Sequence, residues 1–91
     1  MIVESTGDVF SDLGFEPAEA AILRMRARLM SDLREQIEAR NMTQTAAADW
    51  LGITQSRVSD LIRGKWEKFS LEMLITLATR AGRQVTIAVA A

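Results

Sequence analysis

The 91-residue chain contains no cysteine and no histidine. Without cysteine it can build neither a disulfide framework nor a thiolate metal site, and without histidine it lacks the commonest general base and metal ligand. The carboxylates show no paired arrangement of the kind that acid–base catalysis uses. We therefore expect no metal, no cofactor and no catalytic residue.

Long apolar runs are also missing. No stretch approaches the roughly 18 to 20 apolar residues that a membrane-spanning helix needs, and the acidic N-terminus is unlike a signal peptide. Hydrophobic residues make up 48% of the chain and charged residues 25%, the balance of an ordinary globular domain. We expect one small cytoplasmic domain with no membrane partner, marginally stable as a monomer.

Charge is distributed unevenly along the chain. The first 22 residues contain no lysine or arginine, so all 11 basic residues lie in the remainder. Such segregation suits a polyanion on the basic part and a basic partner on the acidic part, although a patch this weak is screened at ordinary salt. The acidic residues of the first segment are Glu4, Asp8, Asp12, Glu16 and Glu19.

Residues 1–15 show no sustained period, which predicts a loosely ordered acidic arm. Pro17 then suits the first position of a helix. Apolar residues recur at helical spacing as far as Asn41, a residue type that tolerates the left-handed conformation at a helix C-terminus. The inward face of this long helix is predicted to comprise Ile22, Leu29, Met30, Leu33 and Ile37.

Three shorter helical patterns follow. Thr43, Thr54 and Ser70 are their N-cap candidates, because a hydroxyl can accept a hydrogen bond from the backbone of the first turn. Glycines at positions 52, 64 and 82 end the three patterns. We expect the second helix at about 44–51 and the third at about 55–63, within a domain that spans residues 16–82.

After Gly82 the pattern changes to a period of two. Val85, Ile87 and Val89 alternate with polar or small residues, which predicts a strand at 83–91. Because a lone strand leaves backbone groups unpaired, we expect it to pair with its counterpart in a second copy or with Ile2 and Val3 of its own chain. The predicted fold is all-α, with about four to five helices and one C-terminal strand used for dimerisation.

The stretch TQTAAADWLGITQSRVSDLIRG, residues 43–64, sets two short helical patterns on either side of one glycine. Two helices that meet at a steep angle need a small residue at their contact and a residue free to take positive φ in the turn. Ala48 and Gly52 meet those needs. In a helix-turn-helix the outer face of the second helix enters the major groove of DNA, with its N-terminal residues nearest the base edges.

Residues 43–82 resemble the helix-turn-helix of the lambda-repressor-like (XRE) family, whose pattern appears here as Gln44, Ala48, Gly52, Ile53 and Gln55, followed by VSDLIRGK. With DVFSDLGFEPAEAAILRMRARLM before it and RQVTIAVAA after it, the chain is most similar to small antitoxins of HigA type, which are encoded beside RelE-superfamily toxins. The resemblance implies a sequence-specific DNA-binding antitoxin that represses its own operon as a homodimer on a palindromic operator. It also implies that the protein neutralises a RelE/HigB-like toxin by direct binding.

The resemblance assigns the DNA contacts. Gln44 would hold a phosphate and brace Gln55, while Gln55, Ser56 and Asp60 occupy positions that usually face bases. Glutamine can form two hydrogen bonds with adenine, whereas a carboxylate is useful there only if it accepts from a cytosine amino group or pairs with a neighbouring arginine. Basic residues after the recognition helix are expected to contact phosphates. The expected DNA-binding set is Gln44, Thr54, Gln55, Ser56, Arg57, Ser59, Asp60, Arg63, Lys65 and Lys68.

Apolar residues stand among the carboxylates of the arm. They serve either as a hydrophobic staple for the first helix or as part of a toxin-binding segment, and the sequence does not separate the two. Trp50 is expected to fold back over residues 9–15 or to mark a partner surface, and Trp66 to cover the edge of the core. The candidate toxin-binding residues are Phe10, Asp12, Leu13 and Phe15.

Three function classes follow from these patterns. The leading one is the DNA-binding antitoxin. The alternative is a stand-alone XRE-family transcriptional repressor of prophage type, without a toxin partner. An enzyme is the remote third.

Overall fold

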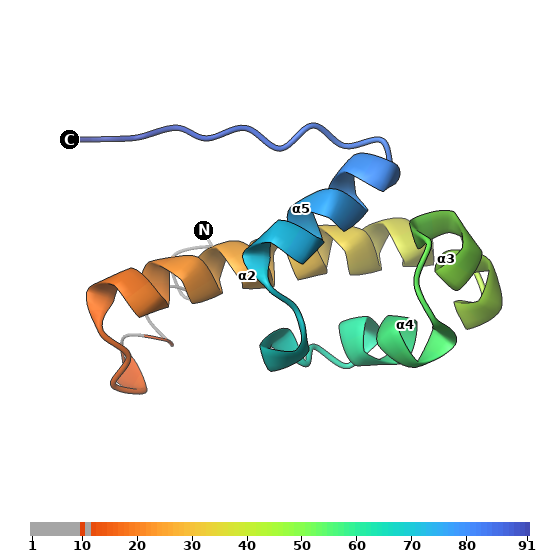
Figure 1. Ribbon diagram of the computed structural model, residues 1–91, viewed down its shortest axis with the longest axis horizontal. Helices are drawn as coiled ribbons and strands as arrows, with labels where there is room; N and C mark the ends of the chain where they lie inside the picture. The colour runs from red at the N-terminus through yellow and green to blue at the C-terminus, as the bar shows by residue number, and fades with distance from the viewer. Residues whose placement is uncertain (1–9, 11) are drawn as a thin grey trace.

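The computed structural model describes residue 10 and residues 12–91. Helices dominate this part of the chain: α2 (Pro17–Ala39), α3 (Gln44–Leu51), α4 (Gln55–Ile62) and α5 (Leu71–Arg80), with a short 3-10 helix, η1 (Trp66–Lys68), between the last two. Figure 1 shows α2 as the long axis of the molecule, with α3 and α4 at its C-terminal end and α5 crossing it on the side away from α4. The expected helical bundle with a helix-turn-helix is confirmed.

Helix α2 begins and ends where the sequence predicts. Pro17 stands in its first turn, and the Glu16 backbone N–H donates to the Glu19 carboxylate at 3.3 Å, one half of a capping box. Just after the helix, Asn41 adopts φ 55°, in the left-handed region. The predicted inward face is partly wrong: Ile22 is 42% exposed, and its neighbour Leu23 is buried instead.

The three shorter helices are capped by the expected hydroxyls. The side-chain oxygens of Thr43, Thr54 and Ser70 each accept a hydrogen bond from the backbone N–H three residues further on, at 3.0 to 3.1 Å. Each such cap satisfies one of the otherwise unpaired donors of a first turn, worth about 1 kcal/mol. The boundaries of α3 and α4 are therefore fixed by local chemistry.

The main core lies where α2, α3, α4 and α5 meet. Helical spacing turns one apolar stripe of each helix inward, and Phe69 enters from the loop after η1. Leu51 of α3 and Val58 and Leu61 of α4 are fully buried in this core. The buried members are Met30, Leu33, Ile37, Ala47, Ala48, Leu51, Val58, Leu61, Phe69, Leu74, Leu77 and Ala81.

A second, smaller cluster joins the segment before α2 to the body. The rings of Phe10, Phe15 and Trp66 meet edge to face, with all three centroid distances at 6.2 Å, an arrangement favoured by the quadrupoles of aromatic rings. Phe10 is buried against Ala20 and Leu23 of α2. In residues 10 and 12–15 the arm is thus folded onto the body rather than loosely ordered, because Phe10 is buried there and Phe15 is partly buried beside it.

Residues 83–91, expected as a strand, form no strand in the described part of the chain. They follow α5 as an extended tail that runs back toward the N-terminal end of α2 (Figure 1). A strand needs a partner for its backbone groups, and this tail lies beside none of the described segments in a ladder. The alternative partner, Ile2 and Val3, lies outside the described residues.

Within the described residues, no helix has the length and apolar character needed to cross a membrane.

Candidate nucleic-acid interface

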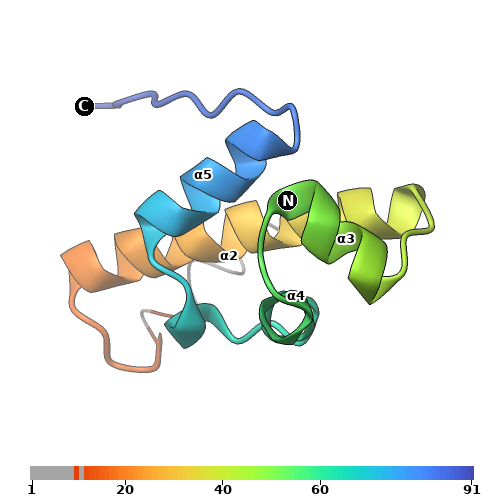
Figure 2. The ribbon, with the colours of Figure 1, turned by 45° about the vertical axis from the view of Figure 1, so that its right-hand side comes forward.

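The turn between α3 and α4 is built around Gly52. This glycine caps α3 in the left-handed conformation, with φ 71° and ψ 37°, and the backbone N–H groups of Gly52 and Ile53 both donate to the Ala48 carbonyl, at 2.8 and 3.0 Å. A residue with a Cβ is strained in that conformation. Ala48 is buried at the helix contact, as the sequence predicts. Figure 2, turned by 45° from Figure 1, shows α4 nearly end-on beneath α3.

Arg80 secures this turn from α5. Its guanidinium donates a hydrogen bond to the Leu51 carbonyl at 2.8 Å, at the C-terminal end of α3, where unpaired carbonyls favour a cation. A Cβ built on Gly52 would lie 3.0 Å from the same guanidinium. Glycine at position 52 therefore provides both the positive φ and the space for the arginine. The sequence pattern does not reveal this contact, because 29 residues separate donor and acceptor.

We expect Arg80→Ala to lower the free energy of unfolding by about 1 to 3 kcal/mol, because it leaves helix-terminal carbonyls without a charged donor. Urea unfolding followed by circular dichroism measures the change. Arg28→Ala, at an exposed position of α2, is the matched control and should stay within about 0.5 kcal/mol of the unchanged protein. Equal losses in the two variants would show that Arg80 does not brace the turn.

The first turn of α4 presents polar side chains to solvent. Gln55 and Ser56 are exposed, and Ser59 and Asp60, one turn further, are half-buried at the edge of the same surface. Thr54 is exposed as well, but its hydroxyl oxygen is engaged in capping α4. Gln44 and Gln55 are the first residues of α3 and α4, and both are exposed.

Arg57 contacts its own chain rather than facing outward from α4. Its guanidinium donates a hydrogen bond to the Lys68 carbonyl at 2.9 Å and lies 5.8 Å from the centre of the Phe69 ring. The cation–π distance is within the range that stabilises such a pair. Arg57 therefore ties the recognition helix to the segment that follows η1, in addition to any contact with DNA.

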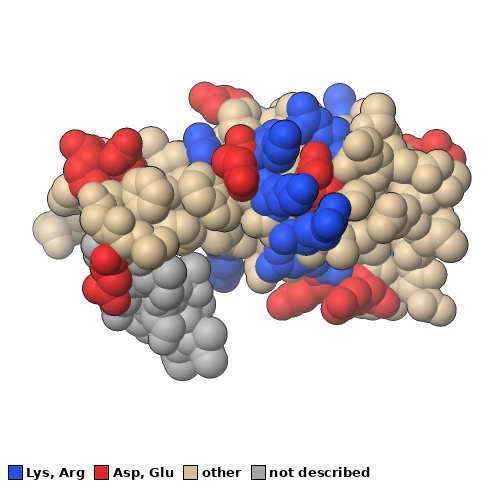
Figure 3. All heavy atoms as spheres, turned by 90° about the horizontal axis from the view of Figure 1, so that it is seen from below, with Lys and Arg blue, Asp and Glu red and all other residues tan. Residues whose placement is uncertain are grey.

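Basic side chains gather on the face where α4 and η1 lie, the lower side in Figure 1. Figure 3 shows them as a band across the middle of this face, with acidic groups along its edges and also among the basic side chains. Arg63 and Lys68 are exposed, and Lys65 is half-buried. Arg34 of α2, which the sequence did not single out, reaches the same region, since its guanidinium would lie 3.2 Å from a Cβ on Gly64. The band therefore combines residues from two distant parts of the chain.

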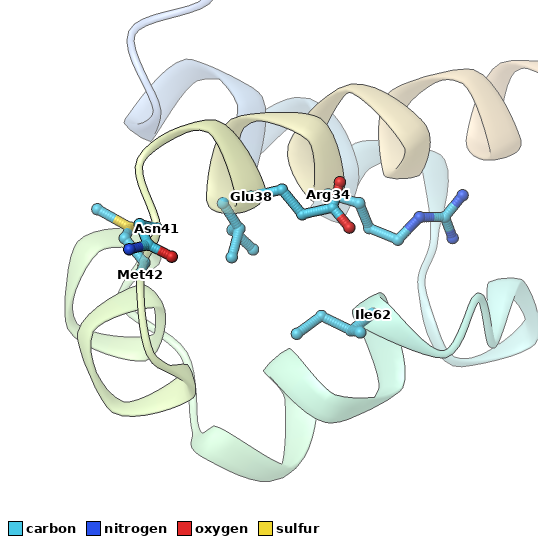
Figure 4. Close-up of a pocket in the computed structure, with 6 residues that line it drawn as sticks. Arg34, Glu38, Asn41, Met42 and Ile62 are labelled. Atoms are coloured by element: carbon cyan, nitrogen blue, oxygen red, sulfur yellow. The ribbon is translucent and has the colours of Figure 1, made fainter.

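An open hollow of about 430 Å³ separates the C-terminal end of α4 from α2. In Figure 4, Ile62 projects from α4 on one side, Arg34 and Glu38 come from α2 on the other, and Asn41 and Met42 close one end. Ile62 is therefore 40% exposed beside the hollow, although its neighbour Leu61 is fully buried in the core.

Trp66 lies where the sequence predicts, whereas Trp50 does not pack over the described part of residues 9–15. Trp50 packs at the edge of the main core, and Arg40 lies over its ring at 4.5 Å from the centroid. Among the described residues, Trp66 rather than Trp50 meets the aromatic rings of the segment before α2. Trp66 touches both clusters, so it covers the edge of the core as the sequence predicts.

Helices α3 and α4 are joined at Gly52, which adopts the left-handed conformation, and the first turn of α4 is exposed on the face that carries the basic band. This arrangement defines a helix-turn-helix module. A family model described as a helix-turn-helix domain matches residues 9–90, and the chain belongs to this family. No curated protein matches the chain. Membership indicates a DNA-binding regulator.

Proposed function

We propose that this protein is a lambda-repressor-like transcriptional repressor that binds a palindromic operator as a homodimer. The observation that carries the proposal is the first turn of α4, where Gln55 and Ser56 are exposed, together with the basic band on the face where α4 lies. An α-helix fits the major groove, and the N-terminal residues of a recognition helix lie closest to the bases.

The proposed contacts divide into two kinds. Gln55 and Ser56 read bases, with Ser59 and Asp60 at the margin of the reading surface. Gln44 and Thr54, at the N-terminal ends of α3 and α4, approach the phosphates, which helix N-termini attract. The remaining phosphate contacts come from Arg63, Lys65 and Lys68, with Arg57 as a brace between α4 and the loop.

Binding of the purified protein to the DNA upstream of its own reading frame tests the proposal. Fluorescence anisotropy should give a dissociation constant at least about 1,000-fold lower than for a shuffled duplex of the same composition, measured at one salt concentration. Equal affinity for the two duplexes would reject sequence-specific repression.

We further propose that the repressor is an antitoxin of HigA type, which captures a RelE-superfamily toxin. Asp12 and Leu13 support this role, since both are exposed and Leu13 keeps 69% of its surface in solvent. A carboxylate beside an apolar anchor suits a basic protein that binds RNA: opposite charges speed the encounter, and burial of the anchor slows dissociation. The residues Glu4 and Asp8, which would add charge, lie outside the described part.

One observation favours the alternative, a stand-alone repressor without a toxin. Phe10 and Phe15, two of the four candidate toxin-binding residues, pack against Trp66 of their own chain. This is the staple role that the sequence also allowed. The toxin-binding proposal therefore depends on Asp12 and Leu13, with the phenylalanines holding the segment in place.

We expect the double variant Asp12→Lys and Leu13→Asp to lose capture of the toxin encoded beside it, while operator binding stays unchanged. Burial of a leucine contributes about 1.5 to 3 kcal/mol, so the affinity should fall at least about tenfold. Co-purification of the tagged toxin and its dissociation constant give the readouts. Glu72→Lys, an exposed charge reversal on α5, is the control. Full capture by the double variant would contradict toxin binding through this segment, and the absence of any neighbouring toxin gene would favour the stand-alone repressor.

A further inference from the structure

Two arginine side chains lie against the two glycines that flank the recognition helix. The guanidinium of Arg80 is 3.0 Å from a Cβ built on Gly52, and that of Arg34 is 3.2 Å from a Cβ built on Gly64. Both glycines adopt positive φ, at 71° and 73°. Arg80 donates to the Leu51 carbonyl, whereas Arg34 donates to no backbone carbonyl in the described part of the chain. The two arginines therefore occupy similar places but make different contacts.

The C-terminal end of α4 does not depend on Arg34 for a cap. The carbonyls of residues 59–61 each accept a hydrogen bond from a backbone N–H of residues 63–65, at 3.0 to 3.1 Å. Among the described residues, the guanidinium of Arg34 makes one long hydrogen bond, 3.5 Å to the Ser31 hydroxyl oxygen. A guanidinium carries several N–H donors in a planar fork, so most of those of Arg34 have no acceptor within the described chain.

The carboxylate nearest along the helix does not neutralise Arg34. No ion pair joins Arg34 to Glu38 in the part of the chain that the structure describes. In Figure 4 the guanidinium of Arg34 is directed away from the Glu38 carboxylate. Arg34 is half-buried beside the hollow between α2 and α4, so its stem is packed while its charged end reaches solvent. The structure thus holds a positive charge in a restricted position.

This charge lies next to residues that the proposed function assigns to DNA phosphates. Gly64, which the guanidinium approaches, stands between Arg63 and Lys65 in the chain. All three basic residues are near the end of α4, on the face that carries the basic band (Figure 3). The planar fork of arginine matches the oxygens of a phosphate and can form two parallel hydrogen bonds with it.

We propose that Arg34 binds a DNA phosphate, so that α2 forms part of the DNA-binding surface together with the helix-turn-helix. The inference rests on the DNA binding of the proposed function and adds a contact from outside residues 43–82. Phosphate contacts fix the position of a protein on the duplex without reading bases. Gln44 and Thr54 are proposed to fix the N-terminal ends of α3 and α4, and Arg34 fixes the C-terminal end of α4.

The salt dependence of DNA binding tests this contact. For Arg34→Ala we expect the affinity for the operator and for a random duplex to fall alike, by about three- to tenfold. The slope of log affinity against log salt should decrease by roughly 1, because one phosphate contact is lost. Arg34→Lys keeps the charge but loses the fork, so it should keep the slope and lose part of the affinity.

Arg28→Ala is the matched control. It removes the same charge from an exposed position of the same helix, roughly 120° around α2 from Arg34. We expect its affinity and its salt slope to match those of the unchanged protein. A decrease of the slope by the same amount in Arg28→Ala would show a general effect of net charge and overturn the assignment to Arg34.

A structural role of Arg34 would give a different result. Loss of a brace would lower the urea midpoint but would leave the salt slope of the folded protein unchanged. Circular dichroism of each variant at the assay temperature therefore accompanies the titrations, and Arg34→Gln, which keeps most of the stem, replaces the alanine variant if that variant does not fold. A folded variant with an unchanged slope overturns the proposal.

Neutral methylphosphonate groups, placed one at a time along the operator, give a second measurement. The group at the phosphate that Arg34 binds should weaken binding of the unchanged protein and have no effect on Arg34→Ala. If every such group weakens the two proteins by the same factor, Arg34 contacts no phosphate and the proposal is wrong.

The random duplex separates this inference from the proposed repressor. Equal affinity of the unchanged protein for the two duplexes would reject sequence-specific repression, and a smaller salt slope of Arg34→Ala on the random duplex would still retain the phosphate contact. Specific operator binding with the same slope in both proteins would reject the contact and retain the repressor. A chain that binds neither duplex would reject both.

Discussion

Gln55→Ala is expected to weaken binding to the cognate operator by about 1 to 3 kcal/mol while leaving binding to random DNA nearly unchanged. Gln55 is the first residue of α4 and is exposed, so a glutamine there can form two hydrogen bonds with an adenine that alanine cannot replace. Titration of both duplexes at one salt concentration separates the loss of specificity from a loss of general affinity.

Lys65→Ala is the matched comparison, since Lys65 lies in the basic band rather than on the first turn of α4. We expect it to weaken both duplexes alike and to lower the slope of log affinity against log salt by roughly 1, the signature of one lost phosphate contact. If Gln55→Ala reduces affinity for random DNA as much as for the operator, Gln55 contacts the DNA backbone and does not read a base.

Trp66→Ala should lower the free energy of unfolding by up to about 3 kcal/mol. The ring packs against both apolar clusters and meets Phe10 and Phe15 edge to face, so its loss leaves a void between the body and the segment before α2. A domain of this size has only about 5 to 10 kcal/mol in total, so the change is readily measured by urea unfolding.

Trp50→Ala serves as the comparison for Trp66→Ala, because Trp50 is also half-buried but packs against the main core alone. We expect the smaller loss from Trp50→Ala. If Trp50→Ala lowers the free energy of unfolding more than Trp66→Ala does, the aromatic contacts of Trp66 contribute little to stability. Contacts other than those of Trp66 would then hold the segment before α2 against the body.

The local features of the fold could be predicted from the sequence. Thr43, Thr54 and Ser70 cap their helices, and Gly52 takes the left-handed conformation, because these choices depend on residues within one helical turn. The side of α2 that faces inward near its N-terminus could not be predicted. Leu23 is buried there and Ile22 is not, because Trp66 and Phe10 pack against that side, and the pattern within α2 does not reveal their positions.

The candidate site likewise contains features that the sequence predicts and features that it does not. The pattern around Gly52 predicts that the first turn of α4 is exposed, and Gln55 and Ser56 are found there. It does not predict that Arg57 bonds to the Lys68 carbonyl, or that Arg80 reaches the end of α3, because these are long-range contacts between a flexible side chain and a backbone carbonyl. The sequence alone therefore does not distinguish basic residues that bind DNA from basic residues that hold the recognition helix in place.

The residues that anchor α4 in the fold differ from the residues proposed to read DNA, and this difference affects how the protein could change its target. Val58 and Leu61 anchor the helix in the core, Thr54 caps it and Arg57 fastens it to the following loop. The exposed positions of Gln55 and Ser56 carry no part of this anchoring. In the proposed repressor, substitutions at these two positions would alter which operator is recognised at little cost in folding stability, and the rest of α4 and its scaffold would stay the same.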